Sequence, residues 1–238
     1  MKCPNCHFEN KKYLYKYKTF KSNEFDLRCT SLQYQKPNLV KCEKCDLIFS
    51  ELLNLKFESL YEDVEDKLYI DQIPFKKKYF ESTLKKIEKY LSKEKDVLEI
   101  GSYYGIFGSL LSPCVKSYIG LELSRHAVEY AKKEYSLNFI NKTIEEYIND
   151  VNSVDVVLMS HVIEHLDKPF ENIESIAKKM SKNSVLIFST YNMDSLIAKV
   201  LGKNYQWIMP MHKYYFTKRV LKNILGKYNL EIVETISD

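Results

Sequence analysis

Four cysteines near the start of the chain have the spacing of a metal site. Cys3 and Cys6 enclose a Pro-Asn dipeptide, and Cys42 and Cys45 enclose Glu-Lys. The two thiolates of a Cys-x-x-Cys pair can turn toward one ion, and two pairs complete a closed tetrahedral zinc site. Two such pairs favour zinc over disulfides in a reducing compartment. We therefore predict a structural zinc ion held by these four cysteines.

The segment between the two cysteine pairs leaves two details open. His7 follows the first pair directly and Cys29 lies further along, so each is an alternative zinc ligand. Two strand-like runs, 11–20 and 26–34, also lie in this segment. A hairpin formed by these runs would bring the two cysteine pairs together.

A second candidate site is the stretch VLEIGSYYGIFG, residues 97–108. The chain has only six glycines, and Gly101, Gly105 and Gly108 lie in this stretch. A glycine directly after a strand allows a sharp turn and a close approach of the main chain. The free amides at the start of the next helix favour a carboxylate or a phosphate. We expect this loop to lie against a ligand.

An acidic residue follows at the end of the next strand-like run. Glu122 comes 21 residues after Gly101, and a carboxylate at this place can accept hydrogen bonds from the ribose of a nucleoside. The dinucleotide pattern G-x-G-x-x-G would need glycine at the position of Tyr103. The pattern therefore favours a nucleoside-containing cofactor other than a dinucleotide.

Histidines supply the third candidate chemistry, which is proton removal. His161 and His165 follow another strand-like run, and His212 lies in MPMHKYYFT. Histidine titrates near neutral pH and can remove the proton of an acceptor hydroxyl. His165 is our first candidate for the general base, with His161 and His212 as alternatives and Tyr191 as an orienting hydroxyl.

The letters HVIEH also fit the inverted zinc-protease motif H-x-x-E-H. That motif needs both histidines on one helix and a further acidic ligand, for which Glu171 and Glu174 are available. Here the motif directly follows a buried strand-like run, which predicts a strand–loop junction at His161. A metalloprotease is therefore the less favoured alternative.

Alternating strand-like and helical patterns must position these residues. The strand-like runs are 96–101, 117–123, 137–141, 154–160 and 184–190, and a last one is expected at 230–236. Helical patterns cover 104–112, 125–135, 144–149, 169–180, 193–201 and 217–228, and a further one begins at Phe75. Such alternation predicts an α/β fold with a doubly wound, mostly parallel sheet. Ligands of such sheets bind beyond the carboxyl ends of the strands.

Composition excludes several classes of protein. A chain of 238 residues with 45% hydrophobic and 29% charged residues is typical of a globular protein with one core and a small module. The longest apolar runs are far shorter than the roughly 20 residues that cross a bilayer, and the first residues do not form a signal peptide. We predict a cytoplasmic protein. The net charge of +4 is spread over helical patterns, which argues against a nucleic-acid partner.

Taken together, these motifs resemble the class I S-adenosylmethionine-dependent methyltransferases. VLEIGSYYGIFG resembles the first motif of that superfamily, YIGLELS its second, and VDVVLMSHVIEHLDKP its fourth-strand region. More narrowly, CPNC, KCEKCDLIFSE, YNMDSLIAKVLGKNYQW and HKYYFT resemble the branch that joins a four-cysteine zinc ribbon to this fold.

The resemblance implies a Rossmann-like methyltransferase domain over 75–238, a zinc-ribbon module over 1–60 and a linker over 61–74. It implies S-adenosylmethionine as the cofactor and a small-molecule acceptor, commonly a sugar or sugar-nucleotide of polysaccharide or secondary metabolism. The residues that it assigns to the cofactor are Glu99, Gly101, Ser102, Tyr103, Gly105, Glu122, Leu123, Thr143, Ile144 and Ser160.

Three departures from the family pattern keep alternatives open. Tyr103 replaces the middle glycine of the first motif, and Thr143 stands where an acid often lies near the adenine. The sheet is also expected to lack its last strand, and an open edge invites self-association into an oligomer. The alternatives are an RNA methyltransferase guided by the zinc ribbon, whose binding would fall steeply with salt, and a non-catalytic cofactor-binding module.

Overall fold

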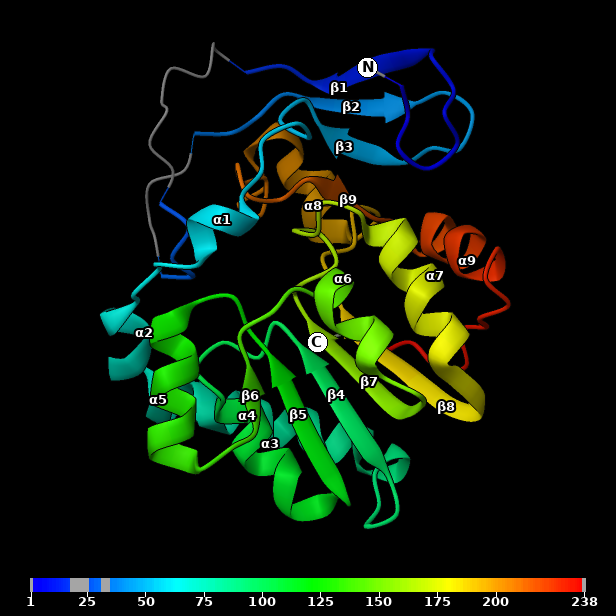
Figure 1. Ribbon diagram of the computed structural model, residues 1–238. Coiled ribbons are helices and arrows are strands. Elements are labelled where there is room, and N and C mark those ends of the chain that lie inside the picture. The colour runs from blue at the N-terminus through cyan, green and yellow to red at the C-terminus, as the bar shows by residue number, and fades with distance from the viewer. Residues whose placement is uncertain (1, 18–25, 31–34, 237–238) are drawn as a thin grey trace.

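The computed structural model describes residues 2–17, 26–30 and 35–236. Figure 1 shows a parallel sheet with helices on its two faces and a small set of strands beyond its carboxyl ends. In chain order the strands of the parallel sheet are β4 (Asp96–Ile100), β5 (Ser117–Leu121), β6 (Phe139–Ile140), β7 (Val154–Ser160) and β8 (Met180–Ser189). The first five of the six expected strands are therefore present.

The strand order in this sheet is β6-β5-β4-β7-β8, and every neighbouring pair is parallel. The chain moves from β4 toward one edge and then crosses back to β7, so the order reverses between β4 and β7. The prediction of a doubly wound parallel sheet is confirmed. This reversal is where such sheets bind ligands.

Helices cover both faces because alternate residues of the strands are buried on opposite sides. Val97, Val156 and Leu158 pack against one layer of helices, while Leu98 and Val157 pack against the other. The first layer contains α3 (Ile73–Ile87), α4 (Ile106–Leu111) and α5 (Arg125–Tyr135). The second contains α6 (Ile144–Tyr147) and α7 (Pro169–Lys179).

Local signals account for where these helices begin. The Ser124 hydroxyl oxygen accepts a hydrogen bond from the Ala127 amide at 3.1 Å, which caps α5. Pro169 occupies the first turn of α7, where its missing N–H costs nothing. Both boundaries agree with the sequence patterns.

The small antiparallel sheet has the order β1-β2-β3-β9. Its strands are β1 (Lys11–Tyr15), β2 (Leu39–Cys42), β3 (Ile48–Ser50) and β9 (Tyr214–Tyr215). β9 comes from the other end of the chain, so the C-terminal region completes the N-terminal sheet. One core joins the two regions, because Val40 and Phe49 pack in the same buried cluster as Ile163 and Phe216.

The expected hairpin between the cysteine pairs is described only in part. Over the described residues β1 pairs with β2 and residues 26–30 have no strand; residues 18–20 and 31–34 of the two runs lie outside the described residues. The prediction of a strand over 230–236 was wrong. Leu230 and Ile232 pack their side chains into the shared core instead, and Glu234 pairs with Lys89.

The remaining elements are short. They are α1 (Glu58–Tyr61), α2 (Lys67–Asp71), α8 (Leu196–Leu201) and α9 (Lys218–Gly226), with 3-10 turns η1 (Glu88–Tyr90), η2 (Ser112–Cys114), η3 (Ile148–Asp150) and η4 (Gly202–Asn204). The segment expected to be a linker, 61–74, thus contains a helix of its own. Over the described part of the chain, no helix is both long and apolar enough to traverse a membrane.

Candidate functional site

The four predicted zinc ligands converge at one end of the small sheet. The Cys3 and Cys45 sulfur atoms lie 3.5 Å apart, those of Cys6 and Cys42 lie 3.6 Å apart, and all four lie within 4.8 Å of one another. Zinc–sulfur bonds of about 2.3 Å in a tetrahedron place the sulfur atoms about 3.8 Å apart. The four thiols therefore fit one zinc ion.

The two cysteine pairs have matching backbone turns. The residue after each pair is left-handed, with φ of 57° at His7 and 61° at Asp46. The His7 amide donates to the Cys3 carbonyl at 2.9 Å, and the Asp46 amide donates to the Cys42 carbonyl at 3.1 Å. His7 is therefore part of the backbone turn that follows the first cysteine pair. Among the described residues, neither His7 nor Cys29 belongs to the cluster of possible metal ligands formed by the four cysteines.

The glycine loop follows β4 as predicted, with φ of +71° at Gly101 and +77° at Gly105. A Cβ on Gly101 would lie 2.4 Å from Val162, and one on Gly105 would lie 2.8 Å from Ala131. The loop thus needs glycine for its left-handed backbone and for close packing against protein atoms. Approach of a ligand is not the only reason for these glycines.

Glu122 lies at the end of β5 with 8% of its surface exposed. One carboxylate oxygen accepts from the Tyr103 amide, and the other accepts from the Leu123 and Ser124 amides, each at 2.8 Å. Burial raises the pKa of Glu122, although these three amides lower it in part. The oxygen that faces Tyr103 retains capacity for a further donor. A ribose hydroxyl can supply that donor, so the carboxylate fits a nucleoside.

A cavity of about 330 Å³ is lined by Leu123, which directly follows Glu122. Its lining is mostly polar and consists of Lys56, Ser59, Glu62, Leu123, Asn141, Lys142, Thr143 and Glu146. The Thr143 hydroxyl and amide are already bonded to Glu146 in a capping box, and Ile144 is buried in the core. Thr143 therefore contributes shape to this cavity. Two of the residues assigned to the cofactor, Leu123 and Thr143, thus border one cavity.

Two further residues assigned to the cofactor are buried, Glu99 on β4 and Ser102 in the glycine loop itself. Glu99 is 3% exposed, and its carboxylate accepts a short hydrogen bond from the Tyr118 hydroxyl. The Ser102 hydroxyl donates to the Glu99 carbonyl at 3.0 Å. Burial and the charge of Glu122 raise the pKa of Glu99 to about 8, even though the Tyr118 hydrogen bond lowers it.

A buried glutamate and three histidines meet beyond the end of β7. His161 follows β7 in a left-handed conformation with φ of 54°, and its Nδ1 lies 3.4 Å from a carboxylate oxygen of Glu164. His165 and His212 lie close to the same carboxylate. The structure thus brings together the three histidines that the sequence proposed, with Glu164 at their centre.

These histidines differ in exposure and acidity. The His161 side chain is 35% exposed, whereas His212 is buried. Burial and the His212 charge lower the pKa of His165 to about 3, and burial also lowers the pKa of His212. Burial alone would raise the pKa of Glu164, but the surrounding histidines outweigh it and hold that pKa below its ordinary value.

Aromatic rings form a wall beside His161. The Tyr191 ring centroid lies 4.6 Å from that of His161, 4.3 Å from Trp207 and 5.4 Å from His212. Ser160 lies at the end of β7, with its hydroxyl 3.4 Å from that of Ser189 at the end of β8. Tyr191 and Trp207 therefore border the space next to His161.

Sequence analysis missed the part that α2 plays in this region. Asp66 is completely buried and accepts hydrogen bonds from the Thr30 hydroxyl at 2.6 Å and the Tyr103 hydroxyl at 3.1 Å. Its carboxylate also caps α2 by accepting from the Tyr69 amide. An Asp directly before an apolar run was the available signal. The segment expected to be a linker therefore covers the glycine loop.

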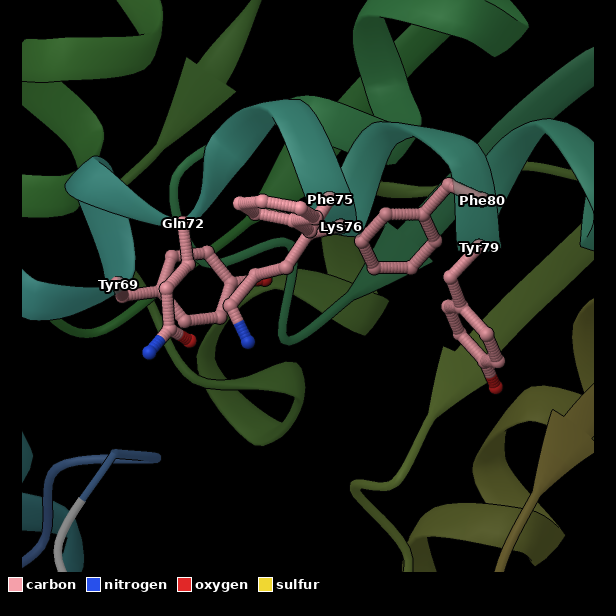
Figure 2. A pocket seen from close by; sticks show the side chains of 6 residues that line it. All are labelled: Tyr69, Gln72, Phe75, Lys76, Tyr79 and Phe80. Carbon is pink, nitrogen blue, oxygen red and sulfur yellow. The ribbon is translucent and has the colours of Figure 1, made fainter.

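A second cavity, of about 580 Å³, lies along α2 and α3. Figure 2 shows the side chains that line it on one side of these helices, namely Tyr69, Gln72, Phe75, Lys76, Tyr79 and Phe80. The lining is mostly aromatic, and among the described residues that line it Lys76 is the charged one, with its ammonium 4.2 Å from the Tyr69 ring centroid. The cavity suits a partly apolar molecule.

The zinc-protease alternative is wrong. Its motif requires a helix across His161 and His165, but residues 161–168 form turns and bends. The described residues that cluster with metal-ligand geometry here are Glu164, His165 and His212, which is not the protease set.

Comparison with known proteins supports one family. A family model described as a methyltransferase domain matches residues 74–235. The chain is 28% identical over 149 residues to a mitochondrial ubiquinone biosynthesis O-methyltransferase of Schizosaccharomyces pombe, covering 57% of this chain and 54% of that protein. It is 30% identical over 116 residues to a malonyl-acyl-carrier-protein O-methyltransferase of Halalkalibacterium halodurans, covering 40% of this chain and 43% of that protein.

The chain spans about half the length of the curated relatives it matches. Among solved structures, a SAM-dependent methyltransferase from Archaeoglobus fulgidus matches with a TM-score of 0.57 and 23% identity, over 68% of this chain and 74% of that one. At this level of identity the match establishes the fold alone.

Proposed function

This chain belongs to the methyltransferase-domain family, whose donor is S-adenosylmethionine, and we propose that it methylates an oxygen atom of a small-molecule acceptor. The observation that carries this proposal is the contact between His161 and buried Glu164 beyond the end of β7. A hydroxyl acceptor must lose its proton, and a histidine backed by a carboxylate is suited to take it. The relatives named above are O-methyltransferases, which is in line with an oxygen acceptor.

The cofactor would be held by the loop after β4 and by the end of β5. The turn at Gly101 and Gly105 and the adjoining Ser102 and Tyr103 would border its amino-acid part, and Glu122 would accept from the ribose. The cavity bordered by Leu123 and Thr143, next to Ile144, would receive the base. When bound, S-adenosylmethionine supplies a methyl group activated on a sulfonium.

Among the three histidines we infer that His161 is the base. Its side chain is 35% exposed and its Nδ1 faces Glu164, so Nε2 is the atom left for the acceptor proton. His165 has a pKa of about 3 and would be a weak base. Glu164 would stabilise the imidazolium that forms when His161 takes the proton. Tyr191 lies against His161 and would help to orient the acceptor.

We propose a chemical class for the acceptor. The sequence resemblance suggests a sugar or sugar-nucleotide, and the aromatic faces of Tyr191 and Trp207 beside His161 offer flat apolar surfaces on which a ring can pack. The lining of the cavity along α2 and α3 combines such rings with Lys76, which can meet an anionic group. A small acceptor with a ring and a negative charge fits both features.

We also propose that the zinc ion is structural and that the protein is cytoplasmic. Four cysteine ligands leave no open coordination position for a substrate. The proposed organisation is a zinc-binding module over 1–60 and a catalytic region over 75–238, joined by the segment 61–74 that covers the glycine loop.

Two variants separate cofactor binding from proton removal. Glu122→Gln should weaken S-adenosylmethionine binding in calorimetry about tenfold or more, because a hydrogen bond to a charged group is worth about 1.5–3 kcal/mol. His161→Ala should leave that affinity within about twofold but slow turnover roughly 10²–10⁴-fold, measured as S-adenosylhomocysteine release. His126→Ala, at an exposed histidine on α5, is the matched control.

The acceptor panel should contain sugar-nucleotides, catechols and acyl carboxylates. Unchanged turnover in His161→Ala would remove His161 as the base. Failure of the wild-type protein to bind S-adenosylmethionine would instead favour a non-catalytic module and contradict the proposed function as a whole.

A further inference from the structure

Glu164 is a buried carboxylate whose oxygens have no hydrogen bond from the described residues. It is 1% exposed, and neither of its oxygens accepts a hydrogen bond. His161 lies 3.4 Å from one oxygen, but its Nδ1 is also buried without a hydrogen bond, so the carboxylate can still take a further partner. Burying a carboxylate in this way is costly unless another group compensates it.

Two imidazoles place a ring nitrogen near this carboxylate, and Nδ1 of His165 also lies 3.3 Å from the Tyr61 hydroxyl. One ligand atom each from Glu164, His165 and His212 lies within 4.8 Å of the others. These residues come from two separate loops, one after β7 and one before β9. The loops are already joined by backbone hydrogen bonds, because the Lys213 and Tyr214 amides donate to the Glu164 carbonyl at 2.8 and 3.2 Å.

The His212 ring is held in the form that a metal ligand needs. Its Nδ1 lies 2.8 Å from the Trp207 carbonyl oxygen, which can only accept a hydrogen bond. Nδ1 therefore carries the proton, and Nε2 keeps a free lone pair. A carbonyl that fixes the tautomer and direction of a histidine is the usual second layer of a metal site.

We propose that Glu164, His165 and His212 bind one divalent transition-metal cation. Two imidazole nitrogens and one carboxylate oxygen suit Zn²⁺, Mn²⁺, Fe²⁺ or Co²⁺ better than Mg²⁺ or Ca²⁺, which prefer oxygen ligands. The cation compensates the charge of Glu164 and ties the loop after β7 to the loop before β9. This site is separate from the cysteine site. It shares Glu164 with the proposed base His161, but metal binding can be measured without cofactor or acceptor, so the two proposals are tested apart.

Cobalt substitution distinguishes the two sites in the full-length protein. Co²⁺ bound by four thiolates gives intense sulfur-to-metal charge-transfer absorption, whereas Co²⁺ bound by imidazole and carboxylate lacks it and absorbs weakly in the visible. We expect wild-type protein to bind two equivalents of Co²⁺, one with each signature. Glu164→Gln and His212→Gln should each lose the second equivalent and keep the first, while the control His126→Gln keeps both.

Glu164→Gln retains the volume of the buried side chain and removes its charge, so it is the variant expected to stay folded. Thermal melting and the retained thiolate absorption check that it does. A wild-type protein that binds only the thiolate equivalent would overturn the proposal. So would a second equivalent that survives in both Glu164→Gln and His212→Gln. Neither outcome bears on whether S-adenosylmethionine binds, so this proposal and the proposed function can fail independently.

Discussion

Replacing Glu99 by glutamine tests whether a carboxyl group in the core of the sheet is protonated at neutral pH. Glu99 lies on β4 with 3% of its surface exposed. Burial is the main cause that raises its pKa to about 8, and the nearby charge of Glu122 adds to it. Glutamine keeps the volume and one oxygen that can accept from the Tyr118 hydroxyl, but it cannot ionise.

The pKa values set both the sign and the size of the effect. The ordinary pKa is 4.5 and the folded value about 8, a difference of about 3.5 units. Because the folded-state pKa is raised, the protonated carboxyl contributes its full stability below about pH 4.5. That contribution is lost as the pH rises toward 8, where the folded carboxyl also ionises. At 1.36 kcal/mol per unit, the whole loss is about 5 kcal/mol at most.

Urea unfolding at pH 5, 6, 7 and 8 measures the effect. The difference in free energy of unfolding between Glu99→Gln and the wild type should change by a few kcal/mol in favour of the variant between pH 5 and pH 8. Glu129→Gln, at an exposed glutamate on α5, is the control and should run parallel to the wild type. If Glu99→Gln also runs parallel to the wild type, the Glu99 carboxyl ionises as freely as in the unfolded chain, and the reasoning from burial is refuted.

Two further predictions concern the zinc site and the glycine loop. Cys42→Ser should abolish binding of the metal ion by the thiolates and lower the melting temperature. It should also slow turnover, because Cys42 lies in the same buried core as Ile163. Full turnover without that metal ion would contradict the expected link between the cysteine site and the catalytic region. Gly105→Ala should cost about 1–3 kcal/mol in urea unfolding, because φ is +77° and the new Cβ would lie 2.8 Å from Ala131. Gly226→Ala is its control, since a Cβ there meets nothing within 4 Å, and equal effects would refute the strain.

The sequence predicted the parallel sheet well because the signals for it are local. The helix over 125–135 follows from a capping Ser124 and an apolar stripe, and α5 has the same bounds. The antiparallel sheet could not be predicted in this way. β9 has only two residues, Tyr214 and Tyr215, and its pairing with β3 joins segments far apart in the chain. The run 230–236 has strand-like letters but joins neither sheet of the described residues, which its own residues do not reveal.

The candidate site was predicted as a set of residue types but not as an arrangement. His165 was the first candidate for the base, with His161 and His212 as alternatives, because sequence spacing carries no information on burial. In the structure the His161 side chain is 35% exposed and His212 is buried, and burial lowers the pKa of His165 and His212. The covering role of Asp66 was missed, since its partners Thr30 and Tyr103 are distant in sequence.

The zinc site and the histidine cluster are connected through a short path of backbone contacts. Cys42 ends β2, which pairs with β3, and Ile48 and Phe49 of β3 pair with Tyr215 and Tyr214 of β9. The residues just before β9 are His212, which faces Glu164, and Lys213, whose amide donates to the Glu164 carbonyl. Among the described residues β3 is the strand partner of β9, and the Glu164 carbonyl holds the same segment directly. We therefore expect that a metal ion bound by the four cysteines would support β9 through β2 and β3, and that its loss would disturb the contact between His212 and Glu164.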